Sequence, residues 1–172
     1  MDFLELAKRR YSSRKYKSLP VEMEKLAKIL EAGRVAPTGA NTQPQRIIVV
    51  REAAGLEKLK KGANIHGAPL GLIICGDHKA SWKRPYDGKD ILELDSAIVT
   101  THMVMEATDL ELDSIWVCYF DPEIIKTEFK IPDNYEALSI IGIGYGDGPK
   151  ASPDRHDKAR KPLEDTVFYE SF

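Results

Sequence analysis

Short apolar runs alternate with segments of helical periodicity along this chain, and no other feature constrains its fold as strongly. Apolar runs of this length, bounded by turn residues, are typical of strands. Four are predicted, at residues 47–50, 70–75, 114–120 and 137–144, and the first two read as buried strands. The longest periodic segment, residues 91–108, predicts a central helix. The alternation predicts a three-layer α/β domain and leaves the order and direction of the strands open.

Shorter helices are expected between the strands. They cover residues 2–9, 21–32, 53–60 and 122–129. Asp2 is placed to cap the first of them, and Gly33 is expected near the end of the second. Asp121 followed by Pro122 is a suitable cap and first residue for the last one. Residues 81–90 are polar and broken by proline and glycine, so we expect an exposed loop there.

Size and charge restrict the classes of protein. A chain of 172 residues that is 42% hydrophobic can close one core, so we expect a single domain over residues 1–172. A net charge of -2 offers no general attraction for nucleic acid or anionic membrane, so any anion site must be local. We expect a soluble cytoplasmic protein, because no signal-like order or membrane-length apolar run is present. Cys75 and Cys118 lie in apolar stretches and are expected to be buried thiols.

Two basic segments lie near opposite ends of the chain. In the first, Arg10 and Arg14 flank Ser12, and guanidinium groups with a hydroxyl between them suit a phosphate. In the second, Lys158 and Arg160 alternate before a proline, so an extended segment would point both the same way. Taken alone, each segment is better explained as a solvated surface, the first compensating a helix dipole and the second forming a tail.

A polar loop, residues 36–44, stands between them just before a predicted strand. Gly39 allows a close approach of the backbone to a ligand, and Asn41 and Gln43 offer donors and acceptors for the edge of a heteroaromatic ring. A plain turn between helix and strand explains the loop equally well.

Together, the three segments resemble the FMN-dependent nitroreductase family. Chains of that family begin with a short helix and an Arg-x-Ser-x-Arg-like segment, continue with a Pro-Ser/Thr-x-x-Asn-x-Gln-Pro loop, and close with Lys-x-Arg-x-Pro. The matching residues here are Arg10, Ser12 and Arg14, then Pro37, Thr38, Asn41, Gln43 and Pro44, then Lys158, Arg160 and Pro162. Between them, Ala68-Pro69, a long helix, Trp116 and the run from Gly142 to Tyr145 follow the family's usual succession.

This resemblance implies an α+β fold, a three-layer α/β/α sandwich with a mixed, mostly antiparallel central sheet between helices. It also implies a tightly intertwined homodimer with FMN at the subunit interface. The residues implied to contact FMN are Arg10, Tyr11, Ser12, Arg14, Pro37, Thr38, Gly39, Asn41, Gln43, Asn64, Trp116, Val117, Cys118, Tyr119, Lys158 and Arg160.

Each group of these residues has an implied role. The basic residues and Ser12 would hold the phosphate and the ribityl chain, while the loop from Pro37 to Asn41 would reach the flavin of the other subunit. Backbone N–H groups near Cys118 and Tyr119 would be directed at N5 and O4 of the flavin. Lys61 or Asn64 would stabilise charge at its N1–C2=O edge.

The implied activity is an NAD(P)H oxidoreductase of ping-pong type. NADH or NADPH would reduce FMN and leave, and a small acceptor such as a nitroaromatic or a quinone would take its place. The cofactor carries the redox chemistry, so no catalytic side chain is expected. A flavin or nucleotide binding protein without turnover, such as a sensor or carrier, is the main alternative. An enzyme that anchors the phosphate of another cofactor is a weaker one.

The chain departs from the family pattern in three places. Residues 110–114 lack the glycines of the Gly-Leu-Gly-like turn that many relatives carry, which questions the geometry at N5. Tyr11 stands where relatives often have a second basic residue. The insertion that often covers the substrate is short; residues 79–89, with Trp82 and Tyr86, are a candidate lid, and packing on the surface explains this aromatic pair equally well.

The remaining polar motifs indicate no further site. The four histidines have no spacing typical of a shared metal, so no metal is expected, and His102 reads as a structural residue of the long helix. The run GIGYGDG lacks the glycine spacing and the following helix of a dinucleotide-binding fingerprint.

Overall fold

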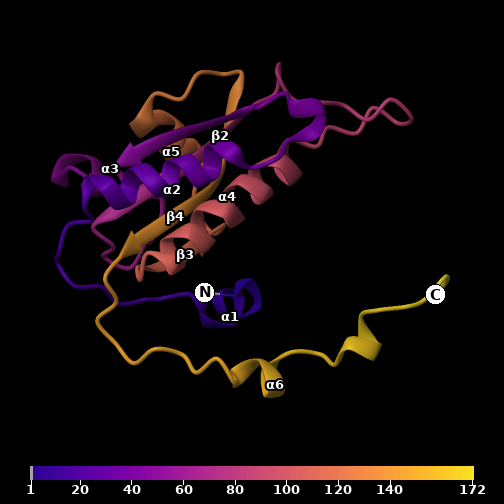
Figure 1. Ribbon diagram of the computed structural model, residues 1–172. Helices are drawn as coiled ribbons and strands as arrows, with labels where there is room; N and C mark the ends of the chain where they lie inside the picture. Colours follow the sequence, from indigo (N-terminus) through magenta and orange to yellow (C-terminus); the bar gives the residue numbers. More distant parts are fainter. Residues whose placement is uncertain (1) are drawn as a thin grey trace.

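The structure, a computed structural model, describes residues 2–172. Its centre is a sheet in which the strands lie in the order β1-β2-β4-β3 and every neighbouring pair is antiparallel (Figure 1). The strands are β1 (Gln45–Val50), β2 (Leu70–Asp77), β3 (Asp113–Val117) and β4 (Tyr135–Gly144). An isolated parallel bridge between Ser12 and Ser114 adds the N-terminal segment to the β3 edge.

Helices follow the predicted alternation. They are α1 (Phe3–Arg9), α2 (Met23–Val35), α3 (Ala53–Gly62), α4 (Leu92–Asp109), α5 (Pro122–Phe129) and α6 (Arg155–Ala159), with 3-10 turns at Gly39–Asn41 and Leu163–Asp165. The predicted caps are confirmed, since the Asp2 side chain accepts from Leu4 N at 3.1 Å and Asp121 accepts from the N–H groups of residues 123 and 124. These carboxylates satisfy amide groups that the first turn of a helix leaves without partners.

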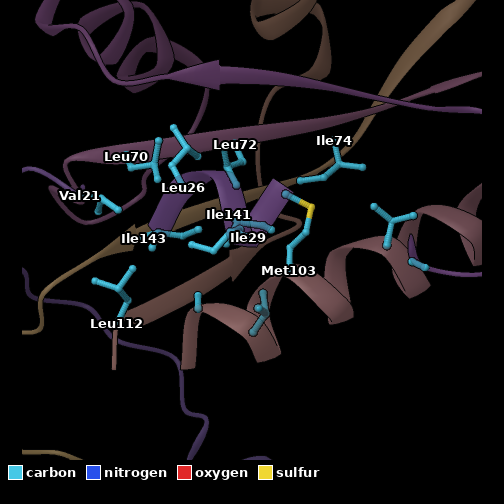
Figure 2. Close-up of a cluster of buried hydrophobic side chains, with 14 residues drawn as sticks. Val21, Leu26, Ile29, Leu70, Leu72, Ile74, Met103, Leu112, Ile141 and Ile143 are labelled. Atoms are coloured by element: carbon cyan, nitrogen blue, oxygen red, sulfur yellow. The ribbon is translucent and has the colours of Figure 1, made fainter. Parts of the chain in front are cut away.

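Two apolar cores lie on opposite faces of the sheet. Alternate residues of a strand point to opposite faces, so β2 and β4, the two central strands, supply both cores. Leu72 and Ile141 face α2 and α4, where they pack with Ile29 and Met103 (Figure 2). Ile73 joins the second core with residues of α3 and α5. The expected three-layer sandwich with a mostly antiparallel sheet is confirmed.

Three local expectations were wrong. The strand at residues 47–50 is not buried as a whole, because β1 is an edge strand and Val50 is its one buried residue. The strand expected over residues 114–120 ends at Val117, and Phe120 instead forms an isolated bridge with Ala63. The predicted end of α2 at residue 32 was three residues early, since the helix runs to Val35; Gly33 lies near that end as expected, at the contact with α4, where a Cβ would come within 2.8 Å of the Met103 sulfur.

The cysteines have different environments. Cys75 is buried, as expected, and burial raises the pKa of its thiol to about 11. The expectation that Cys118 is buried was wrong: it is exposed because it follows the last residue of β3. Across residues 2–172, the search for a helix long and apolar enough to cross a membrane finds none.

After Gly148 the chain leaves the sheet and runs past α1 (Figure 1). Helix α6 belongs to this tail, and all residues from 161 to 172 are exposed.

Candidate functional site

The N-terminal basic segment is fixed against the edge of the sheet. Helix α1 ends at Arg9, and Ser13 N then donates to Ser114 O of β3 at 2.9 Å. The Tyr11 hydroxyl donates to the Asp113 carboxylate at 2.8 Å. Burial, followed by this bond, raises the pKa of Tyr11. The segment therefore has a defined position beside β3, and the Tyr11 hydroxyl is already engaged by the protein.

The C-terminal basic segment reaches the same place. The Arg155 guanidinium donates to the carbonyls of Lys8 at 3.0 Å and Arg10 at 2.6 Å, and so ties α6 to the end of α1. The pKa of Arg10 is lowered by burial first and then by the positive charges of Arg155 and Arg160. Three guanidinium groups from the two ends of the chain thus lie within electrostatic range of one another.

This cluster fits an anion. Among residues 2–172, none of Arg10, Arg14, Lys158 and Arg160 forms an ion pair with a carboxylate, although acidic residues pair with other cations on the surface. Cations that repel one another without a counter-charge are a suitable environment for a phosphate, whose oxygens accept charge-assisted hydrogen bonds. The charge and the donors of this cluster therefore suit a phosphate group.

The expected geometry of the tail was wrong in detail. Lys158 and Arg160 do not alternate along an extended segment, because residues 155–159 form the short helix α6. Lys158 belongs to this helix, and Arg160 is the extended residue at its C-terminal end, with its Nε 3.5 Å from Nδ1 of His156. Arg155, which holds the tail in place, was missed; the available signal was a further cation at helical spacing before Lys158.

A second part of the site lies where β3 ends. Val117 is buried and Trp116 half-buried, whereas Cys118 and Tyr119 are exposed. Tyr119 and Asn64 line one hollow of about 570 Å³, since the bridge between Ala63 and Phe120 brings their segments together. The exposed backbone after the strand and the polar side chain beside it form a surface against which a planar ring can lie.

Of the two candidates for the N1–C2=O edge, Asn64 fits better than Lys61. The Lys61 ammonium forms an ion pair with Glu128 at 2.6 Å. The Asn64 side-chain oxygen accepts from His66 N at 2.8 Å, an arrangement that leaves the amide NH₂ as a donor.

The loop before β1 is held in an unusual conformation. Ala40, Asn41 and Gln43 all have positive φ, at 47°, 56° and 50°. The Thr38 carbonyl accepts from Asn41 N at 2.9 Å, and the Thr38 hydroxyl from Gln43 N at 3.0 Å. The side chains of Pro37, Asn41 and Gln43 are left exposed.

A single chain does not bring this loop to the basic cluster. The loop leads into β1 at one edge of the sheet, and the basic cluster lies beside β3 at the other. Four strands have three gaps of about 4.8 Å, so on the order of 14 Å separates the edges. The sequence placed both in one site, and within one protomer the structure keeps them apart.

The candidate lid has two different aromatic residues. Residues 79–90 form a loop that projects from the body of the protein (Figure 1). Trp82 is half-buried at its base, where its Cβ lies 3.3 Å from the position a Cβ would take on Gly39. Tyr86 is 97% exposed. Packing accounts for Trp82, whereas Tyr86 has the exposure that a lid residue needs.

The turn before β3 keeps a left-handed residue without glycine. Glu111 has a φ of 62°, and Leu112 N bonds to Ala107 O at 2.9 Å to close the end of α4. The backbone geometry that the missing glycines would favour is therefore present, with Glu111 at the strained position. His102, in α4, is hydrogen-bonded through Nδ1 to Ile98 O at 2.8 Å, which confirms its structural reading.

Comparisons with known proteins show the family and the fold of the chain. A protein-family model described as "Nitroreductase family" matches residues 7–65 and 56–145 of the chain. The chain is similar to the crystal structure of a nitroreductase family protein from Clostridium difficile 630, with 52% identity, full coverage of both chains and a TM-score of 0.98. It resembles an FMN-dependent nitroreductase from Clostridium difficile R20291, with 30% identity over 98% of this chain and 99% of the other and a TM-score of 0.81. A relative from Methanothermobacter thermautotrophicus, named "Putative NADH dehydrogenase/NAD(P)H nitroreductase", is 31% identical over 95% of this chain and 87% of its own.

Proposed function

This chain belongs to the nitroreductase family, and on that premise we propose that it is an FMN-dependent NAD(P)H oxidoreductase that reduces a small acceptor such as a nitroaromatic or a quinone. The observation that carries the proposal is the cluster of cations from both ends of the chain, which lies beside β3 without carboxylate partners among residues 2–172. We further propose that residues 1–172 form one flavin-binding unit.

In this proposal the protein's residues bind and orient the cofactor. Arg10, Ser12 and Arg14 hold the phosphate from the N-terminal segment, and Lys158 and Arg160 hold it from the tail. The Tyr11 hydroxyl is bonded to Asp113, so Tyr11 contributes to the site by holding the N-terminal segment against β3. The bonds of Tyr11 and Ser13 to β3 fix the N-terminal groups before the cofactor binds, which lowers the ordering cost of binding.

The end of β3 would receive the ring of the cofactor. Trp116 and Val117 would lie beneath it, the backbone N–H groups near Cys118 and Tyr119 would donate to it, and Asn64 would serve its N1–C2=O edge. Donors at these positions favour the reduced, anionic form. Bound FMN supplies hydride transfer, from NADH or NADPH in one half-reaction and to the acceptor in the other. The protein needs no side-chain acid or base for it.

We propose that a second copy of the chain completes each site. An apolar groove of about 980 Å³ runs between α1, α2 and α4, and exposed residues such as Phe3 and Val35 line it. The loop with Pro37, Thr38, Gly39, Asn41 and Gln43 lies at the sheet edge opposite the cations of its own chain, and we propose that it serves a neighbour's flavin. Exposed apolar surface and a divided site both favour a homodimer.

The first test is the flavin itself. The purified protein, or the protein reconstituted with FMN, should be yellow and should be bleached anaerobically by NADH or NADPH. A panel of nitroaromatics and quinones should then reoxidise it, with parallel-line kinetics that indicate a ping-pong order. A protein that refuses added FMN contradicts the proposal. Flavin that dithionite reduces and neither nicotinamide does would favour the alternative of a binding protein without turnover.

The second test addresses the phosphate site. Arg14→Ala and Arg160→Ala should each weaken FMN binding by roughly 1.5 to 3 kcal/mol, the scale of a hydrogen bond to a charged group. Lys15→Ala is the matched control: it removes a cation from the same segment, but Lys15 pairs with Asp147 at 3.0 Å and takes no part in the cluster. If both arginine variants bind FMN as tightly as the parent protein and the control do, the phosphate lies elsewhere.

A further inference from the structure

We propose that Asp95 of α4 is a positioning residue for the loop of residues 37–43, and that through this loop it controls the flavin site of the neighbouring subunit. This inference rests on the proposed function, because it requires that the loop contact the partner's FMN. It adds a residue that has no place in the motifs of the sequence, and it assigns a role to a buried carboxylate that the proposed chemistry does not use.

Asp95 is an unusual residue for the interior of the protein. It is 1% exposed, and its Oδ1 accepts from Gly39 N at 2.9 Å. Its Oδ2 is buried and has no hydrogen-bond partner among the described residues. Burial of a carboxylate is costly unless its bonds offset the lost hydration. Asp95 lies in the first turn of α4, where a carboxylate favours the helix dipole, and the one hydrogen bond that its side chain accepts from a described residue is the one donated by Gly39 N of the loop.

The loop needs an external support. With three positive φ angles at non-glycine residues, its backbone is strained, by an amount on the order of 1 kcal/mol or more for each. Its backbone N–H groups at Asn41, Thr42 and Gln43 bond to Thr38 or Gly39, and the Gln43 side chain adds a bond to Asn41 O. The bond from Gly39 to Asp95 is the one that ties Thr38 and Gly39 to α4.

Gly39 is also the point of closest approach. A Cβ at this residue would lie 2.4 Å from Cδ1 of Ile91 and 3.3 Å from Cβ of Trp82. A side chain at this position would therefore displace either the loop or the Ile91 side chain. Asp95 pulls the loop toward α4 while Ile91 and Trp82 limit its approach, and together they set the direction in which Asn41 and Gln43 project.

The experiment measures the FMN dissociation constant of Asp95 variants. Asp95→Ala removes the acceptor and should weaken FMN binding by roughly 10- to 100-fold, whereas Asp95→Asn keeps an acceptor oxygen and should stay within about threefold of the parent protein. Thr100→Val is the matched control on the same helix, since it removes bonds of a buried hydroxyl to Ser96 and Ser139 without touching the loop. It should lower the melting temperature and leave FMN affinity unchanged.

Mixed dimers test whether the effect crosses the interface. One chain carries Asp95→Ala and the other Arg160→Ala, with different affinity tags for purification. If the loop acts on the partner, one of the two sites combines the intact loop with the intact phosphate residues, and it should bind one FMN per dimer with parental affinity. If Asp95 acts within its own chain, both sites are damaged and no tight site remains. A general loss of stability cannot produce the first result.

A second variant keeps the test valid if Asp95→Ala fails to fold. Gly39→Ala displaces the loop without altering α4 and should weaken FMN binding similarly, and Ile91→Val, which removes the nearest atom, should restore part of the loss in the double variant. Parental FMN affinity in Asp95→Ala overturns the inference while leaving the proposed function intact, and so does a mixed dimer without a tight site. A parent protein that binds no FMN overturns the proposed function itself.

Discussion

Arg155 gives the most informative perturbation, because it separates tethering from charge. Its guanidinium bonds to the carbonyls of Lys8 and Arg10, and these bonds hold Lys158 and Arg160 near the N-terminal segment. Replacement by alanine removes both bonds and one positive charge. Replacement by lysine keeps the charge, but a single ammonium cannot span both carbonyls as a planar guanidinium does.

The magnitude follows from the two bonds. The bond to the Lys8 carbonyl is exposed and contributes about 0.5 kcal/mol, and the bond to the half-buried Arg10 carbonyl contributes about 1.5 kcal/mol. Their loss, about 2 kcal/mol in total, corresponds to a roughly 30-fold weaker FMN complex. Arg155→Lys should retain one of the two bonds and so lose between about 0.5 and 1.5 kcal/mol, a factor of roughly 2 to 13.

Quenching of flavin fluorescence on titration measures both affinities, and hydrogen exchange of residues 152–165 reports the tether directly. Exchange should be faster in Arg155→Ala than in the parent protein. Lys161→Ala is the control, because it removes an exposed cation from the same tail without altering the contacts to α1. Parental affinity together with unchanged exchange in Arg155→Ala would refute the role of the tether, and a lysine variant equal to the parent would show that charge alone matters.

Three further predictions concern stability and thiol chemistry. The Ser81 hydroxyl, then other contacts, lowers the pKa of Asp90, so its contribution is complete above the unfolded pKa of about 3.9 and is lost as the pH falls through the folded pKa. The difference in melting temperature between the parent and Asp90→Asn should therefore be constant near neutral pH and should disappear in acid. A difference that persists at the lowest pH contradicts this. Cys118 should react rapidly with Ellman's reagent and be protected by FMN, while Cys75 stays unreactive in the native protein; comparable rates for the two would disprove it. Glu111→Gly should raise the free energy of unfolding by about 1 kcal/mol in urea titrations, because glycine tolerates the positive φ, and a loss would show that the glutamate side chain is needed.

Features encoded by neighbouring residues could be predicted from the sequence. Asp121 and Pro122 begin a helix because the carboxylate and the missing N–H both act within one turn. The long helix follows from its apolar period, and its bounds differ from the prediction by about one residue. The family resemblance supplied the antiparallel sheet, which the pattern of strands and helices had left open.

Features that depend on distant contacts could not be predicted. That β1 is an edge strand is decided by its neighbours in the sheet, not by its own apolar residues. Cys118 is exposed because β3 stops one residue earlier, although its sequence surroundings are apolar. Arg155 and Asp95 act through bonds to backbone groups more than 50 residues away; the helical spacing of Arg155 from Lys158 marks a further cation, but no local pattern identifies the partners of either residue.

For the two basic segments, the structure changes which explanation is favoured. Alone, each was better explained as solvated surface, and the implied contacts with FMN stay predictions. The structure adds that the segments meet: Arg10 lies within electrostatic range of Arg155 and Arg160, which repel it. Like charges held close together destabilise the folded chain unless a counter-charge binds between them. Their proximity therefore favours a bound anion over a merely solvated surface.

The two halves of the proposed phosphate site differ in rigidity. Ser13 and Tyr11 bond the N-terminal half to β3, so this half is positioned by the sheet itself. The tail half is exposed and depends on Arg155, which itself adds to the repulsion on Arg10. A dianion between the halves offsets that repulsion, and a ligand stabilises the state that binds it. FMN should thus order residues 155–160 far more than the sheet, so the tail is where flavin binding and folding are coupled.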